Sequence, residues 1–273
     1  SVLKPLQGAE NDGPGDACVI APVHGSKRGL IISNGINPRY GDLDPYQMAA
    51  NAIDEAVRQI IAVGGDLSEV AILDNFCWGR TDKADRLGRL VLAAKACYDV
   101  AKVYGTPFIS GKDSLNNEFR VGERTIVIPG TLLISAIAVT DDVTRSLSMD
   151  AKAAGNHVYV VGRTYRELGG SHYYMLYNEL GAQPPVVRPE EGLKTFNALA
   201  GATRNGLVRS CHDCSEGGIA VAAAEMAFAG GLGMSLALAD APRVDDIDRD
   251  DLLLFSESAS RFICEVEPDK VAA

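Results

Sequence analysis

The sequence predicts an α+β protein of two domains, one over residues 1–150 and the other over residues 151–273. Three observations support this fold class. Short apolar runs typical of strands alternate with longer segments of helical periodicity. The polar stretch TRSLSMDAKAAGNH interrupts this pattern near residue 150, and a new strand-like run follows it. A chain of 273 residues is also long enough to bury two hydrophobic cores.

The first domain is expected to combine strands with two long helices. Asp44 and Pro45 are placed as the N-cap and first residue of one helix, which Gly64 and Gly65 end. The expected strands lie at residues 28–35, 69–75, 106–111 and 130–142. The second helix, over residues 84–105, has an apolar face made of Leu87, Val91, Ala94, Tyr98 and Ala101.

The second domain repeats this mixture on a smaller scale. Its expected strands lie at residues 157–163, 206–213, 233–239 and 261–266. Helices are expected at residues 190–202 and 216–229. Gly217 and Gly218 allow the second of these helices to begin close to whatever Asp213 and Ser215 hold.

Composition and charge exclude several classes of protein. The net charge of −10 argues against a nucleic-acid partner, because such proteins present basic surfaces. No apolar run approaches the roughly 20 residues that span a bilayer, and the N-terminal segment has no apolar signal core. We therefore expect a cytoplasmic protein that binds neither nucleic acid nor membrane. The cysteines are expected to be reduced, and the Cys211–Cys214 pair lacks the second pair that zinc would need.

Gly111 and Lys112, in the stretch ISGKDSLNNE, suggest a nucleotide phosphate-binding loop, but the pattern fails. A Walker loop requires glycine five residues before the Gly of its Gly-Lys pair and a hydroxyl residue after the lysine. This chain has Thr106 and Asp113 at those positions. Any phosphate contact made by Lys112 therefore has to arise in another way.

Six polar side chains are candidate ligands for a hard cation. Oxygen atoms that arrive from several elements suit Mg²⁺, especially when nucleotide phosphates complete its shell. The same residue types also end strands and cap helices without binding anything. His212 is either a general base or an ordinary loop histidine. The six candidates are Asp16, Glu55, Gln59, Asp74, Asp113 and Asp213.

Five segments occur in the order and spacing of a known family. They are GPGDACVI, DPYQMAANAIDEAVRQIIAVGGDLSEVAILDNFCWG, GTPFISGKDSLNNEF, HDCSEGGIAVAAAEMAFAGG and LFSESASRFICEV. Together they resemble phosphoribosylformylglycinamidine synthase, and more closely the second of its two homologous halves. The resemblance implies an aminoimidazole ribonucleotide synthetase-like fold, in which an N-terminal domain pairs its sheet with a partner half and a C-terminal α/β domain follows. The implied activity is ATP-dependent conversion of formylglycinamide ribonucleotide to the amidine in purine biosynthesis, with Mg²⁺ and with ammonia from a glutaminase.

The resemblance assigns roles to one loop and one aspartate. Asp74 and Gly111 match ATP contacts, and Ser114 matches a contact with the ribonucleotide substrate. Lys112 replaces an asparagine that faces magnesium, and a cation cannot bind magnesium. Either Asp113 takes over the metal, or Lys112 contacts phosphate directly.

The resemblance also implies an auxiliary site for ATP or ADP with Mg²⁺. Asp16, Glu55, Gln59 and Asp213 match residues linked to its metal, and Ser215 matches a nucleotide contact. Gln59 replaces an asparagine and is one methylene longer.

The catalytic loop of the family's first half has no counterpart here. Where that loop reads Glu-Ser-His-Asn-His-Pro, this chain reads SNGINP over residues 33–38. General acid–base catalysis needs a group whose pKa lies near the working pH, and this loop has none. We therefore expect no catalytic residue in the chain, which would be inactive alone and would need the first half of the enzyme. We read the sequence as a piece of a longer polypeptide, truncated within its second domain.

Two other functions fit the same residues. A non-catalytic module would bind a Mg-nucleotide only for stability, and Ser114 would then be irrelevant. A stand-alone relative such as thiamine-phosphate kinase would consume ATP with a small substrate. An isolated half is also expected to form a homodimer, because a large exposed apolar sheet face is costly.

Overall fold

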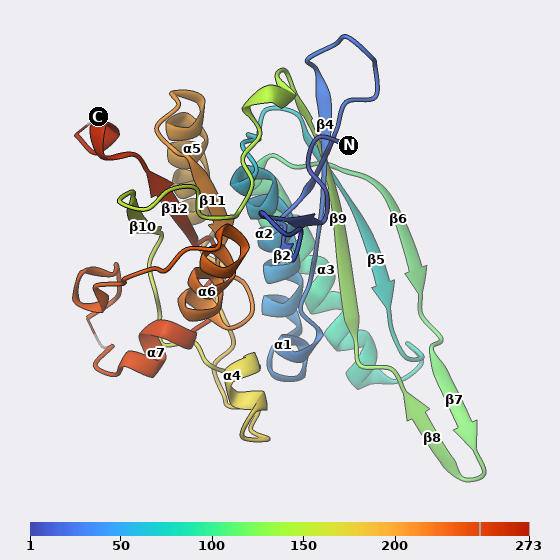
Figure 1. The fold of residues 1–273 in the computed structure, drawn as a ribbon. Helices are drawn as coiled ribbons and strands as arrows, with labels where there is room; N and C mark the ends of the chain where they lie inside the picture. The colour runs from blue at the N-terminus through green and yellow to red at the C-terminus, as the bar shows by residue number, and fades with distance from the viewer. Residues whose placement is uncertain (246, 273) are drawn as a thin grey trace.

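A five-stranded sheet organises the first half of the computed structural model, which describes residues 1–245 and 247–272 (Figure 1). Its strands follow the order β3-β4-β9-β5-β6. Strands β5 and β6 are parallel, and the other neighbours are antiparallel. The strand bounds are β3 Cys18–Ile20, β4 Gly29–Ile36, β5 Val70–Cys77, β6 Phe108–Ser114 and β9 Thr131–Thr140.

Helices α2 (Pro45–Ala62) and α3 (Ala84–Tyr104) cover one face of this sheet (Figure 1). The predicted cap of α2 is confirmed, since the Asp44 carboxylate accepts hydrogen bonds from the backbone N–H groups of Tyr46 (2.8 Å) and Gln47 (3.1 Å). Helix α2 lies between the sheet, α3 and the second half of the chain. Its charged residues are therefore buried together with its apolar ones.

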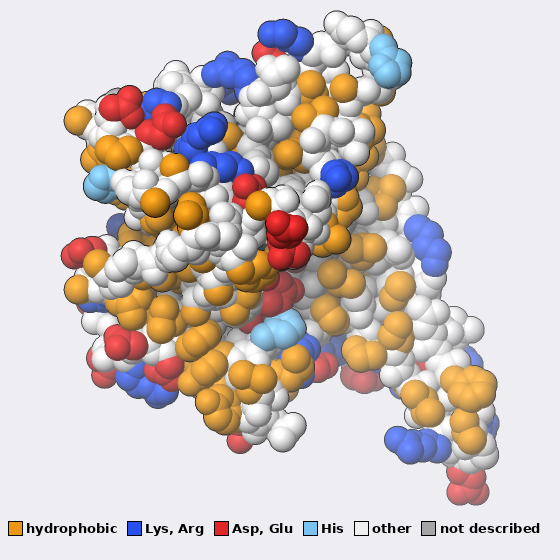
Figure 2. All heavy atoms as spheres, in the orientation of Figure 1, with side chains coloured by type: hydrophobic (Ala, Val, Ile, Leu, Met, Phe, Trp, Pro, Cys, Tyr) orange, Lys and Arg blue, Asp and Glu red, His pale blue; other side chains and the backbone are white. Residues whose placement is uncertain are grey.

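The opposite face of the sheet is open. Side chains alternate along β4, so that Ile31 is buried beneath the helices while Ile32 and Ile36 are exposed. A hairpin of β7 (Glu118–Val121) and β8 (Arg124–Val127) extends beyond the sheet, with hydrophobic side chains on its surface (Figures 1 and 2).

The second half contains a three-stranded antiparallel sheet in the order β10-β12-β11. Its strands are β10 His157–Val161, β11 Ser210–Asp213 and β12 Phe262–Val266. Its helices are α4 His172–Met175, α5 Pro189–Arg204, α6 Gly218–Gly230 and α7 Asp250–Phe255. A small N-terminal hairpin, β1 (Leu6–Gln7) and β2 (Gly13–Pro14), packs on the end of α6, where the Ala9 N–H donates to the Ala229 carbonyl. This packing brings the N-terminal segment to the second half of the chain.

The fold class and most expected elements are confirmed, and several details are wrong. Residues 233–239 form no strand, and a 3₁₀ turn occupies Leu238–Asp240. The SGKDS segment is strand β6 rather than a loop. Three short helices, α1 (Pro38–Leu43), α4 and α7, are not predicted by the sequence pattern. The domain boundary near residue 150 stays a prediction.

The apolar face predicted for α3 is also wrong for most of its members. Leu87, Val91 and Tyr98 are exposed. The buried face is offset around the helix and comprises Ala93, Ala96, Cys97, Val100, Ala101 and Tyr104. Small alanine side chains allow α3 to approach α2 closely, so burial follows backbone approach rather than side-chain size. Among the described residues, no helix combines the length and apolar character needed to cross a bilayer.

Candidate functional site

An interdomain pocket of about 240 Å³ gathers the residues expected at the auxiliary site. Helix α2 supplies Glu55 and Gln59, and the end of β11 supplies Asp213. Asp16 arrives from the segment between β2 and β3, because the N-terminal hairpin is fixed on α6. Residues far apart in the sequence thus line one cavity. Ser215 lines it too, so the structure brings together the five residues expected at the auxiliary site.

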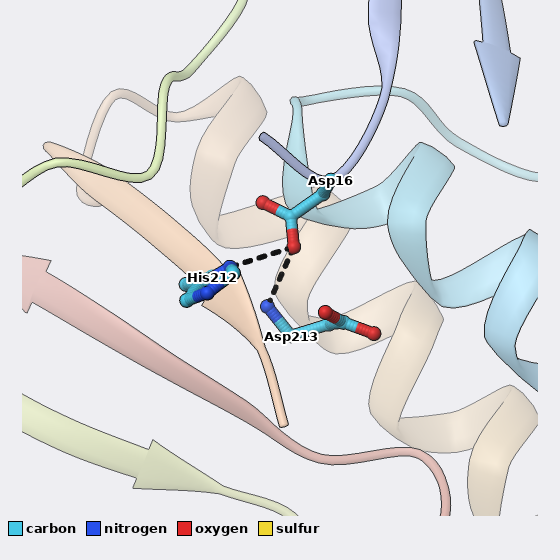
Figure 3. A group of neighbouring side chains, drawn as sticks. All are labelled: Asp16, His212 and Asp213. Carbon is cyan, nitrogen blue, oxygen red and sulfur yellow. Dashed lines mark hydrogen bonds and ion pairs between the residues drawn. The ribbon is translucent and has the colours of Figure 1, made fainter. Parts of the chain in front are cut away.

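Asp16, His212 and Asp213 form the tightest part of the interdomain pocket (Figure 3). The Oδ1 atom of Asp16 lies 2.8 Å from His212 Nδ1 and accepts a hydrogen bond from the Asp213 backbone N–H at 3.0 Å. His212 Nε2 lies 3.1 Å from a carboxylate oxygen of Glu225. One potential ligand atom from each of Asp16, His212 and Asp213 lies within 4.8 Å of the others.

Arg58 is buried beside this pocket, where it bonds to the lining residues Asp213 and Ser215, and it joins the two halves of the chain. Its Nε donates to Asp213 Oδ2 at 2.6 Å, and its Nη1 donates to Asp54 Oδ2 at 2.9 Å. Its Nη2 donates to Ser215 Oγ at 3.1 Å. The sequence reasoning missed Arg58. A signal existed, because Asp54, Glu55 and Arg58 interrupt an otherwise apolar helical stretch on neighbouring turns.

The electrostatics of the pocket follow from burial. Burial raises the pKa of Glu55 to about 8, and Arg58 offsets this only in part. Burial likewise raises the pKa of Asp16 to about 6 against the opposing effect of His212. Burial alone would lower the pKa of His212, but the charge of Asp16 and their hydrogen bond raise it to about 10. The His212 side chain is therefore expected to be positively charged at neutral pH.

These residues fit a divalent cation. Asp16 Oδ2 is buried and has no hydrogen-bond partner among the described residues. The hydrogen bonds to Glu55 fall on its Oε2 atom, from the Ile36 N–H (2.9 Å) and Asn37 Nδ2 (2.8 Å). Those to Asp213 fall on Oδ2. One oxygen of each acid is thus held by the protein, which leaves the other for a hard cation. Arg58 and His212 supply fewer positive charges than the surrounding carboxylates require.

A second group of expected residues, which we call the edge site, lies on the parallel strands β5 and β6. Asp74 is in register with Gly111. A Cβ atom on Gly111 would lie 2.2 Å from Asp74 Oδ1, so the aspartate occupies the space that this glycine leaves free. Burial and the nearby charge of Asp113 raise the pKa of Asp74. Residues from Phe108 to Asp113 are all exposed, so the described residues enclose this site on one side only.

Strand parity divides the edge site between two faces. Asp74, Gly111 and Asp113 share one face, and Lys112 and Ser114 share the opposite one. Lys112 Nζ contacts Ser114 Oγ directly. The structure therefore keeps Asp74 and Gly111 together, but it sets Lys112, also expected at ATP, and the expected substrate contact Ser114 on the open outer face of the sheet. Phe76 and Trp78, which could have stacked on a base, are buried in the core.

His172 is a further residue that sequence reasoning missed. It lines a cavity of about 200 Å³ together with Ile36, Asn37 and Pro38, which belong to the loop that lacks the family's histidines. Its Nδ1 lies 3.7 Å from Glu257 Oε1. The nearby carboxylate of Glu257 raises the pKa of His172. The sequence gives no sign of this proximity, because 134 residues separate His172 from Pro38 in the chain.

The two halves of the chain match two models of one family. Residues 14–133 match the N-terminal domain of AIR synthase related proteins, and residues 153–273 match their C-terminal domain. The chain therefore belongs to the AIR synthase related family.

Within this family, similar curated proteins include phosphoribosylformylglycinamidine synthase subunits named PurL. The chain is 37% identical over 267 residues to PurL of Deinococcus radiodurans, which covers 96% of this chain and 35% of that protein. Identity to PurL of Thermoplasma volcanium is 30% over 269 residues, covering 98% of this chain and 34% of that protein. The chain thus spans about a third of the length of these relatives.

Solved structures support the same fold. Thermotoga maritima PurL complexed with FGAR has a TM-score of 0.74 at 18% identity and covers 99% of this chain and 42% of that chain. The form complexed with ATP has a TM-score of 0.69 at 18% identity and covers 99% of this chain and 41% of that chain. At this identity the likeness concerns the fold, and it confirms the expected resemblance and architecture.

Proposed function

We propose that this chain is the second half of a formylglycinamidine ribonucleotide synthase and contributes ATP and substrate contacts to amidine formation in purine biosynthesis in the cytoplasm. The likeness to PurL proteins, some solved with FGAR, ADP or ATP, supports this reaction. The observation that carries the proposal is the register of β5 and β6, which sets Asp74 against Gly111 at an exposed sheet edge.

In this proposal the two faces of the edge site bind different molecules. Asp74 and Gly111 hold ATP, because a glycine permits close approach of phosphate to the backbone. Asp113, beside Asp74, takes the metal that Lys112 cannot bind. Bound Mg²⁺ would neutralise phosphate charge. Ser114 hydrogen-bonds the ribonucleotide substrate, and Lys112 next to it contacts phosphate.

A second wall for the edge site would come from the first half of the enzyme. The Ser33–Pro38 segment has no side chain suited to proton transfer. A larger residue at Gly35 in that segment would collide with the backbone of α2, since its Cβ would lie 2.1 Å from the Ala52 carbonyl oxygen. We propose that the first half supplies acid–base catalysis, that a glutaminase supplies ammonia, and that the isolated chain is inactive. Isolated chains would pair through the exposed sheet face as a homodimer.

The interdomain pocket is proposed as the auxiliary site, which adds a structural role to the same chain. Asp16, Glu55, Gln59 and Asp213 would hold Mg²⁺, and Ser215 would contact ATP or ADP. The unpartnered buried oxygen of Asp16 favours this role. A ligand that binds only the folded state stabilises it by mass action.

Ser114→Ala in the full-length enzyme tests the proposal. We expect lower turnover with nucleotide retention unchanged, because Ser114 lies outside the interdomain pocket. Ser110→Ala is the matched control, since Ser110 is an exposed serine on the same strand and face. Asp213→Ala should instead lose co-purifying nucleotide, measured by anion-exchange chromatography of the denatured protein. Normal turnover in Ser114→Ala would contradict the substrate contact.

A further inference from the structure

A buried positive charge lies beside the interdomain pocket, bonded to two of the residues that line it, Asp213 and Ser215. Arg58 is 5% exposed, and its guanidinium bonds to Asp54, Asp213 and Ser215. We propose that Arg58 is a resident counter-ion: it substitutes for the divalent cation when the pocket is empty and weakens cation binding when the pocket fills. This inference rests on the metal site proposed above and concerns how that site is regulated.

The contacts of Arg58 explain how the empty pocket stays assembled. Asp54 is fully buried, and it also accepts hydrogen bonds from Tyr104 Oη (2.7 Å) and from the Ser260 backbone N–H (2.8 Å). Asp213 belongs to the other half of the chain and is also buried. An isolated buried carboxylate is strongly destabilising. The Arg58 guanidinium forms an ion pair with one carboxylate from each half and so joins the two without metal.

The arrangement leaves room for a metal beside Arg58. Arg58 and Ser215 both use Oδ2 of Asp213, while Asp16 is held through its Oδ1 atom and keeps Oδ2 unpartnered. A divalent cation can therefore bind the free oxygens with the Arg58 hydrogen bonds intact. Its charge would then stand close to the guanidinium, and the repulsion lowers the affinity. Arg58 weakens binding in this geometry without blocking the pocket.

Arg58→Gln separates this role from ordinary structural support. In EDTA we expect a lower melting temperature, because Asp54 and Asp213 lose their counter-charge. Excess Mg²⁺ should restore most of the loss, and calorimetric titration should show Mg²⁺ binding roughly tenfold tighter than in the natural protein. Arg188→Gln is the matched control: Arg188 bonds to buried Glu167 at 3.0 Å, and neither of its side-chain hydrogen bonds goes to a residue that lines the pocket. Its loss of stability should not be restored by Mg²⁺.

A second variant covers the case in which Arg58→Gln does not fold without metal. Arg58→Lys keeps the charge and loses the forked hydrogen bonds, so we expect lower stability with Mg²⁺ affinity near that of the natural protein. Equal Mg²⁺ affinity in the natural protein and Arg58→Gln would overturn the inference while leaving the metal site standing. If Arg58→Gln bound Mg²⁺ and the natural protein did not, the result would support the inference and refute the proposed metal site of the natural protein. Weaker Mg²⁺ binding in Arg58→Gln than in the natural protein would also overturn the inference, because Arg58 would then hold the metal ligands in place.

Discussion

Replacing Glu55 with glutamine should change how the stability of the protein depends on pH. The pKa of Glu55 rises from an ordinary value of 4.5 to about 8, chiefly because burial disfavours the carboxylate. The folded protein therefore binds more protons than the unfolded chain between these pH values, so stability falls as pH rises. Roughly 2.5 units separate pH 7 from 4.5, which at about 1.4 kcal/mol per unit sets an upper limit of about 3.5 kcal/mol. Because the carboxyl groups titrate gradually around their pKa values, the cost at pH 7 is about 3 kcal/mol.

Glutamine should remove this cost and keep the local structure. Both hydrogen bonds to Glu55 fall on a single oxygen, from the Ile36 N–H and from Asn37 Nδ2, and an amide oxygen can accept both. We expect urea unfolding in EDTA to show that the natural protein loses about 3 kcal/mol more than Glu55→Gln between pH 4.5 and pH 7. Asp16, whose pKa is raised to about 6, titrates in both proteins and cancels in the comparison. Mg²⁺ should flatten the slope of the natural protein alone, because it favours the carboxylate. Identical slopes in EDTA would refute the reasoning.

Three further substitutions test other parts of the structure. Gly111→Ala would force its Cβ against Asp74, so amidine formation by the full-length enzyme should fall by roughly tenfold or more with an unchanged melting temperature; unimpaired turnover would contradict the edge site. Ile32→Lys places a charge on the open sheet face and should convert the isolated chain to monomers in sedimentation velocity; persistent dimers would place the interface elsewhere. Asp44→Ala should cost about 1 kcal/mol in urea unfolding through loss of the α2 cap, and no cost would contradict that cap.

Local signals were sufficient for most of the fold. Helix α2 was predicted from Asp44, Pro45 and a 3.6-residue apolar period, and the structure has it at Pro45–Ala62. Such signals fail where both faces of a helix carry apolar residues and either could be the buried one. Helix α3 carries large apolar residues on the side that is exposed and alanines on the side that is buried, so hydrophobicity alone chose the wrong face. The Gly-Lys pair and the family resemblance predict a loop at the SGKDS segment, but pairing with β5 makes it a strand.

The sequence by itself determined which residue types were available: the carboxylates, the Gly-Lys pair and the absence of histidine from residues 33–38. It also determined the family and the architecture, since both are carried by ordered motifs and local periodicity. Only the tertiary structure decided which of these residues meet. The N-terminal hairpin fixes Asp16 beside Asp213, and the packing of α2 between the two halves inserts Arg58 between Asp54 and Asp213. The contacts of Asp213 with Arg58 and Asp16 join residues more than 150 positions apart, and the physical reason is that long-range packing, not local spacing, sets their distance and burial.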